Sequence, residues 1–125
     1  MTTAPIAAES VARDYIALWN ETDAPRRAEL LRAGWREDAL YLDPLMQGRG
    51  HGAISALVGA VHQRYPGFRF ALLGRPDAHD QQLRFSWTLG PADAPELIQG
   101  TDFVELVDGQ LARVTGFLDK VPVGA

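Results

Sequence analysis

The sequence predicts a single α+β domain in which helices cover one face of an antiparallel sheet. In the first half of the chain, apolar residues recur with the helical period of about 3.6 residues. After Gly67 the apolar residues alternate with polar ones, as they do in strands with one buried face. The 125 residues fit one domain and leave no room for two. Helices followed by strands are typical of the α+β class.

Two helices are predicted before the first strand. Residues 5–20 carry an apolar stripe at helical spacing, made of Val11, Tyr15, Ile16, Leu18 and Trp19. A second helix is expected from Asp23, a typical N-cap, to Gly34, a typical helix end. Pro25 is compatible with the first turn of this helix.

A short strand and a third helix follow. The strand covers residues 39–43 and ends at Pro44, which has no backbone N–H to donate. Residues 48–52 are rich in glycine and form a flexible entry to the third helix. The helical period is then carried by Ile54, Leu57, Val58, Val61 and Tyr65.

Four strands are predicted in the second half, over residues 68–72, 83–89, 96–107 and 110–119. Turn signals separate them at Pro76-Asp77, Gly90-Pro91 and Asp108-Gly109, and the last of these is a strong hairpin signal. Strands joined by short turns predict an antiparallel meander.

Composition and charge exclude several classes of function. The absence of cysteine rules out disulfides, thiolate metal sites and cysteine nucleophiles. With 12 basic and 16 acidic residues, the chain lacks the basic surface that nucleic acids require. No apolar stretch reaches the length of a membrane span, and the first residues do not form a signal-peptide core. We therefore expect a cytoplasmic protein without membrane or nucleic-acid partners.

Asp102 is the most informative position for chemistry. One face of its strand reads Ile98, Gly100, Asp102, Val104 and Leu106, so a single acid interrupts an otherwise apolar row. A buried carboxylate must be paired, hydrogen-bonded or protonated. Two alternatives remain open: a β-bulge that turns Asp102 to solvent, or a partner such as Arg84 that only neutralises it.

Asp43 and Tyr15 are the next candidates. Asp43 ends the first strand on the same face as Tyr41, although Asp-Pro is also a common strand-ending turn. Tyr15 lies on the apolar stripe of the first helix, where its hydroxyl needs a partner, but it could equally be a core aromatic residue.

Two further patterns carry little weight. Gly48-x-Gly-x-Gly52 lacks the spacing and the acidic partner of a dinucleotide-binding loop. Asp77, His79 and Asp80 lie in a turn signal with no distant ligand, so a solvated turn is the preferred interpretation and no metal site is expected.

Four stretches together resemble a known family. They are Asp14-Tyr-Ile-Ala-Leu-Trp19, Glu37-Asp-Ala-Leu-Tyr-Leu-Asp-Pro44, Gly50-His-Gly-Ala-Ile54 and Gly100-Thr-Asp-Phe-Val-Glu-Leu-Val-Asp-Gly109. Their content and order resemble the ketosteroid isomerase pattern and, more widely, the SnoaL-like branch of the nuclear transport factor 2-like superfamily. The resemblance implies a cone-shaped fold, in which a strongly bent antiparallel sheet packs on three N-terminal helices and encloses a pocket. It also implies a homodimer.

The resemblance further implies proton transfer beside a carbonyl group of a small hydrophobic ligand, without a cofactor. Asp43 would be the base, and Tyr15 and Asp102 would hold the enolate oxygen. The reaction would be an isomerisation or an aldol-type cyclisation. The alternative is a ligand-binding or dimerisation module of the same fold without turnover. We expect the pocket wall to include Trp19, Trp35, Tyr41, Met46, His62, Phe85, Trp87 and Phe117.

Overall fold

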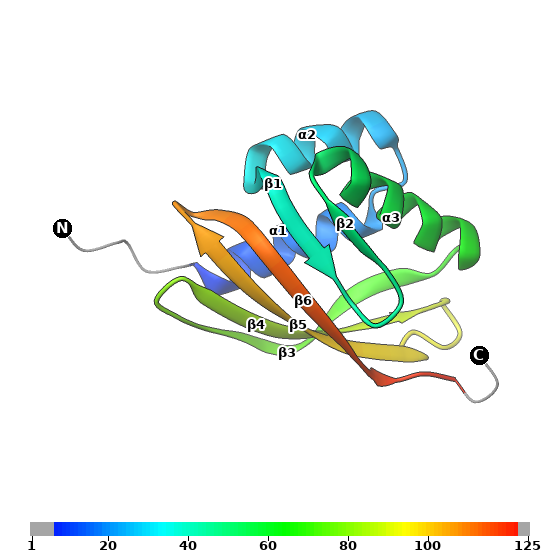
Figure 1. Ribbon diagram of the computed structural model, residues 1–125. Helices are drawn as coiled ribbons and strands as arrows, with labels where there is room; N and C mark the ends of the chain where they lie inside the picture. Colours follow the sequence, from blue (N-terminus) through cyan, green and yellow to red (C-terminus); the bar gives the residue numbers. More distant parts are fainter. Residues whose placement is uncertain (1–6, 123–125) are drawn as a thin grey trace.

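Three helices lie against the concave face of a curved sheet in the computed structural model, which describes residues 7–122 (Figure 1). The helices are α1 (Ala8–Asn20), α2 (Ala24–Gly34) and α3 (His51–Arg64). The strands are β1 (Trp35–Leu42), β2 (Gln47–Arg49), β3 (Arg69–His79), β4 (Gln82–Gly90), β5 (Ile98–Val107) and β6 (Gln110–Lys120). They form one open sheet in the order β2-β1-β6-β5-β4-β3. The predicted α+β class is confirmed.

The sheet is mixed, whereas the sequence predicts a fully antiparallel one. β1 runs parallel to β6, with Tyr41 opposite Val114, and the other four neighbouring pairs are antiparallel. Parallel neighbours need a long connection, and here α3 and four strands separate β1 from β6 along the chain. Turn signals report only on strands that are adjacent in sequence, so this pairing is invisible to them.

The helix boundaries follow the local signals. The Asp23 side chain accepts a hydrogen bond from the backbone N–H of Arg26 at 3.1 Å, which caps α2 as predicted. α1 begins at Ala8, and the first residues of the helix predicted from residue 5 lie outside the described residues. Gly50 precedes α3 with φ +89°, a conformation that favours glycine.

The strand boundaries differ from the prediction in three places. β1 begins at Trp35 instead of residue 39, β2 forms where a flexible glycine-rich entry is predicted, and β3 extends to His79. Pro76-Asp77 is not a turn, because β3 continues through it after a register shift near Gly74, whose φ is +75°. β3 lies at the edge of the sheet, where the missing N–H of Pro76 costs no ladder bond. The predicted hairpin at Asp108-Gly109 is confirmed, with φ values of +51° and +79°.

The core lies between the helices and the concave face of the sheet, and buries mostly aromatic and branched aliphatic residues. Asp102 is one of the few polar residues in it. No helix within residues 7–122 is both long and apolar enough to cross a membrane.

Candidate functional site

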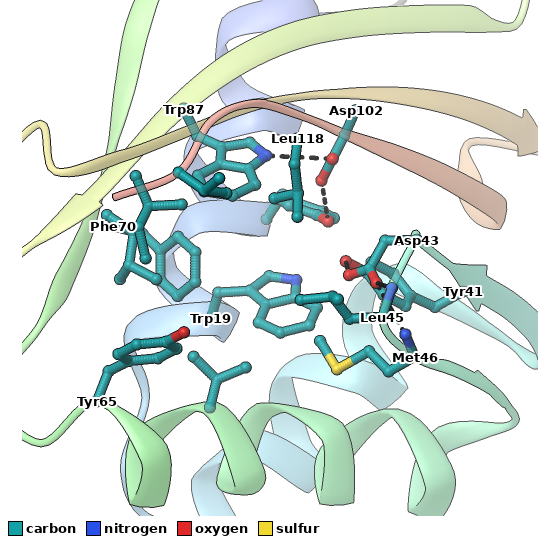
Figure 2. Close-up of a pocket in the computed structure, with 15 residues that line it drawn as sticks. Trp19, Tyr41, Asp43, Leu45, Met46, Tyr65, Phe70, Trp87, Asp102 and Leu118 are labelled. Atoms are coloured by element: carbon teal, nitrogen blue, oxygen red, sulfur yellow. Dashed lines mark hydrogen bonds between the residues drawn. The ribbon is translucent and has the colours of Figure 1, made fainter. Parts of the chain in front are cut away.

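A cavity of about 90 Å³ opens between α1, α3 and the concave face of the sheet. Its wall is formed by Tyr15, Trp19, Tyr41, Asp43, Leu45, Met46, Val61, Tyr65, Phe70, Trp87, Leu89, Ile98, Asp102, Leu118 and Val121 (Figure 2). Leu45 and Val121 are largely exposed and mark the mouth. The wall is therefore apolar, with two carboxyl groups set into it.

Asp102 lies inside the cavity wall and is 2% exposed. The hydroxyl of Tyr15 donates to its Oδ2, and the indole N–H of Trp87 donates to its Oδ1 at 3.1 Å. The strand alternation holds through this position, since Asp102 pairs with Phe85 in regular register. Neither alternative from the sequence applies, because no bulge turns Asp102 outward and Arg84 instead pairs with Asp77 at 3.4 Å.

Burial raises the pKa of Asp102 to about 6. The hydrogen bonds from Tyr15 and Trp87 act in the opposite direction, while the charges of Asp43 and Asp119 raise the pKa further. Burial, followed by the charge of Asp102, also raises the pKa of Tyr15 well above its ordinary value, so this phenol stays protonated. Asp102 can therefore gain or lose a proton near neutral pH, as a general acid or base must.

Asp43 forms a second hydrogen-bonded pair at the mouth. The hydroxyl of Tyr41 donates to Oδ2 at 2.6 Å, and the backbone N–H groups of Leu45 and Met46 donate to Oδ1 at 2.8 and 3.0 Å. Asp43 thus closes the turn after β1 and also lines the cavity, so the two interpretations of this residue are compatible. Burial and the charges of Asp102 and Asp43 raise the pKa of Tyr41, which keeps it a donor.

Gly116 of β6 allows the two carboxyl groups to come close. A Cβ at this position would lie 2.8 Å from Oδ1 of Asp102 and 3.2 Å from Cβ of Asp43. Any side chain here would have to displace one of them. Gly116 was not predicted as a site residue, although a glycine inside a strand is a known sign of a close approach.

The family follows from a match of residues 12–114 to the SnoaL-like domain. The chain belongs to the SnoaL-like family. A proposed isomerase of this family from Agrobacterium tumefaciens str. C58 is 44% identical, with a TM-score of 0.86 over 90% of this chain and 97% of that one. A proposed ketosteroid isomerase from Kribbella flavida DSM 17836 is 26% identical, with a TM-score of 0.69 over 94% of this chain and 82% of that one.

A proposed polyketide cyclase from Sinorhizobium meliloti shares the fold, with a TM-score of 0.68 at 15% identity over 86% of this chain and 93% of that one. No curated protein matches the chain. The resemblance drawn from the four sequence stretches is confirmed at the level of the family and its fold.

The SnoaL-like domain brings Tyr15, Asp43 and Asp102 into the wall of one cavity, from α1, the end of β1 and β5. Half of the other expected wall residues lie there with them, namely Trp19, Tyr41, Met46 and Trp87.

Four expected wall residues lie elsewhere. Trp35 and Phe85 pack against the ring of Tyr15 at centroid distances of 5.8 and 4.8 Å, where they support the site from behind. His62 instead reaches the end of α1 through its Nε2. Phe117 is 51% exposed, because Gly116 takes the inward position and alternation turns its neighbour outward.

Sequence reasoning missed eight wall residues of the SnoaL-like domain: Leu45, Val61, Tyr65, Phe70, Leu89, Ile98, Leu118 and Val121. All but Tyr65 are plain apolar residues that a core would use equally well, so only the inward face of the strands could have indicated Phe70, Leu89 and Ile98. Among the described residues, no lysine, arginine or histidine lines the wall. Within residues 7–122, no three or more His, Cys, Asp or Glu residues are grouped as a metal site requires.

Proposed function

We propose that the cavity binds a small, apolar carbonyl compound and transfers a proton beside its carbonyl group. The observation that carries the proposal is that Tyr15, Asp43 and Asp102 line one apolar cavity, with the two carboxyl groups in different environments. The 44% identical relative, a proposed isomerase, supports isomerisation. An aldol-type cyclisation uses the same first step.

Asp43 is the proposed base. Its Oδ2 accepts one hydrogen bond and Oδ1 accepts two, so Oδ2 keeps a lone pair for a substrate proton. The backbone turn holds the carboxylate in place, which positions it for a carbon-bound proton. In an isomerisation Asp43 returns this proton to another carbon. In a cyclisation the enolate carbon attacks a second carbonyl carbon, and the alkoxide that results takes the proton.

Tyr15 and Asp102 are the proposed partners of the enolate oxygen. In its ionised form Asp102 only accepts hydrogen bonds, and the hydroxyl of Tyr15 is directed at it. When Asp102 is protonated, Tyr15 and Asp102 carry two O–H groups between them. One O–H forms the hydrogen bond within the pair, and the other can donate a hydrogen bond to the enolate oxygen. The apolar wall strengthens such a bond.

This assignment predicts a pH dependence for the reaction. Activity requires protonated Asp102, and its pKa is about 6 in the free protein. We expect kcat/KM to fall about tenfold per pH unit above this value. A profile that rises up to about pH 6 and is level above it would instead make Asp102 the base.

The assay is the conversion of a β,γ-unsaturated cyclic ketone into its conjugated isomer, followed by ultraviolet absorbance. Asp43→Asn is expected to lose about 10²- to 10⁴-fold in rate, the usual contribution of a positioned acid or base. Asp77→Asn, on the outer face of the sheet, is the matched control and should keep the wild-type rate. Ketone binding without turnover in wild-type protein would reject catalysis and favour a ligand-binding module.

We also propose that the chain forms a homodimer through the outer face of the sheet. Phe103 of β5 and Phe117 of β6 are 45% and 51% exposed and meet edge to face at 5.8 Å. Exposed aromatic pairs of this kind are typical of interfaces. Sedimentation should give a dimer for the wild type and a monomer for Phe103→Ser/Phe117→Ser; a monomeric wild type would exclude the proposal.

A further inference from the structure

Trp19 carries a buried hydrogen-bond donor without a partner. Its side chain lines the cavity and is 3% exposed, yet its indole N–H contacts no acceptor among the described residues. An indole can only donate, so the missing partner must be an acceptor. Buried polar groups are paired in most proteins, and an exception needs an explanation such as a ligand.

The other buried side-chain donors of the cavity wall are already engaged. The hydroxyl of Tyr15 and the indole of Trp87 donate to Asp102, and the hydroxyl of Tyr41 donates to Asp43. Among the buried side-chain donors of the wall, the Trp19 N–H alone has no hydrogen-bond partner within residues 7–122. The hydroxyl of Tyr65, which is only partly buried, accepts a hydrogen bond from Arg64.

The position of this donor fits the reacting end of the cavity. Figure 2 shows the nitrogen of Trp19 on the side of the ring that faces Asp43 and Asp102. The N–H of Trp19 also lies near enough to the hydroxyl oxygen of Tyr15 to lower the pKa of this phenol, although the two groups do not meet in hydrogen-bond geometry. The N–H of Trp19 is covered in the structure, so an oxygen of a ligand reaches it beside the Tyr15–Asp102 pair only when neighbouring wall side chains move apart.

The indole is held in place before any ligand arrives. Aromatic rings of Tyr15, Tyr41 and Phe70 surround it at centroid distances of 6.2, 5.1 and 5.7 Å. Nε2 of His62 donates to the backbone carbonyl of Trp19 at 2.7 Å. A donor fixed in this way loses little entropy when it binds an acceptor.

We propose that the indole N–H of Trp19 binds the carbonyl oxygen of the ligand and selects neutral ketones over molecules of the same shape that lack an acceptor. A carboxylate ligand is disfavoured, because two acidic residues and no basic one line the cavity. The inference rests on the proposed function for the identity of the carbonyl compound. Trp19 is thus a specificity-determining residue, and it contributes a neutral donor to the enolate oxygen at any pH.

The test compares indan-2-one with 2-methyleneindane, which has the same shape but no oxygen. Protein with isotope-labelled tryptophan gives one indole N–H signal for each of its 3 tryptophans. The ketone should move the Trp19 signal downfield, and the hydrocarbon should not. The signal of Trp87, whose N–H is bonded to Asp102, is the internal control.

Trp19→Phe keeps an aromatic ring and removes the donor. We expect it to bind indan-2-one about fivefold more weakly, as the loss of one neutral hydrogen bond predicts, and to bind 2-methyleneindane within about twofold of wild type. If this variant does not fold, Trp35→Phe and Trp87→Phe assign the Trp19 signal by elimination. The shifts of that signal with the two probes in wild-type protein then test the proposal.

Equal weakening for both probes would make Trp19 a purely apolar wall residue and would overturn the proposal. So would the absence of a ketone-dependent shift at millimolar concentration, whether the N–H binds water or the ketone binds elsewhere. Indan-2-one has no β,γ carbon–carbon double bond outside its aromatic ring that could be isomerised, so the binding result does not depend on turnover. A shift without isomerase activity would reject the proposed function and keep the role of Trp19.

Discussion

Asp102 links the stability of the fold to pH, because its carboxyl group is 2% exposed. Burial raises its pKa to about 6, compared with 3.8 for an ordinary aspartate. The folded protein therefore keeps a proton between these values that the unfolded chain releases. The resulting stabilisation is fully present below pH 3.8, decreases as the pH rises towards 6, and is lost above it. At pH 4.5 it is worth about 2 kcal/mol, at about 1.4 kcal/mol for each pH unit below the folded pKa.

Asp102→Asn removes this titration. The free energy of unfolding of the wild type minus that of the variant should fall by about 2 kcal/mol between pH 4.5 and pH 7. Urea denaturation followed by circular dichroism measures both proteins at both pH values. Taking the difference between wild type and variant removes the pH dependence that the other carboxylates give to both proteins. Comparing the two pH values removes any constant packing effect of the asparagine.

Asp77→Asn is the matched control, because Asp77 lies on the outer face and is paired only with the exposed Arg84. Its difference from wild type should not show the fall expected for Asp102→Asn. A difference that stays constant with pH for Asp102→Asn would mean that the carboxyl group titrates alike in the folded and unfolded chains. That result would refute both the desolvation argument and the proposed acid role.

Two further substitutions, each with its control, test the close packing at Gly116 and the cap of α2. Gly116→Ala should destabilise the protein by about 1–3 kcal/mol in thermal denaturation, because the new methyl group meets Oδ1 of Asp102 at 2.8 Å. Gly52→Ala is its control: no atom lies within 4 Å of the added Cβ, and a helical alanine should raise the stability by about 0.5–1 kcal/mol. Asp23→Ala removes the cap on the N–H of Arg26 and should cost about 1 kcal/mol, whereas Asp23→Asn should restore most of it; equal losses would assign the effect to charge rather than capping.

Local signals were sufficient for most of the fold. The cap at Asp23, the apolar stripe of α1 and the Asp108-Gly109 hairpin each depend on neighbouring residues, and the structure has all three. The prediction of a turn at Pro76-Asp77 was wrong, because the same dipeptide is compatible with an edge strand. Whether a strand lies at an edge depends on the whole sheet.

The site shows the same division. Asp102 could be found because alternation along one strand placed it on an apolar face. Phe85 lies on a buried face as well, yet it packs behind Tyr15 rather than in the cavity wall. Core and cavity wall use the same residues, so the difference between them depends on where the helices leave space.

By itself the sequence determined the class of the fold, the family and the identity of the three polar residues, because periodicity, caps and short motifs are properties of neighbouring residues. Only the tertiary structure decided that β1 is parallel to β6, that two carboxyl groups meet across Gly116, and that the N–H of Trp19 has no hydrogen-bond partner within residues 7–122. The physical reason is distance along the chain. Tyr15 and Asp102 lie 87 residues apart, and the hydrogen bond between them forms only when α1 packs against the concave face of the sheet.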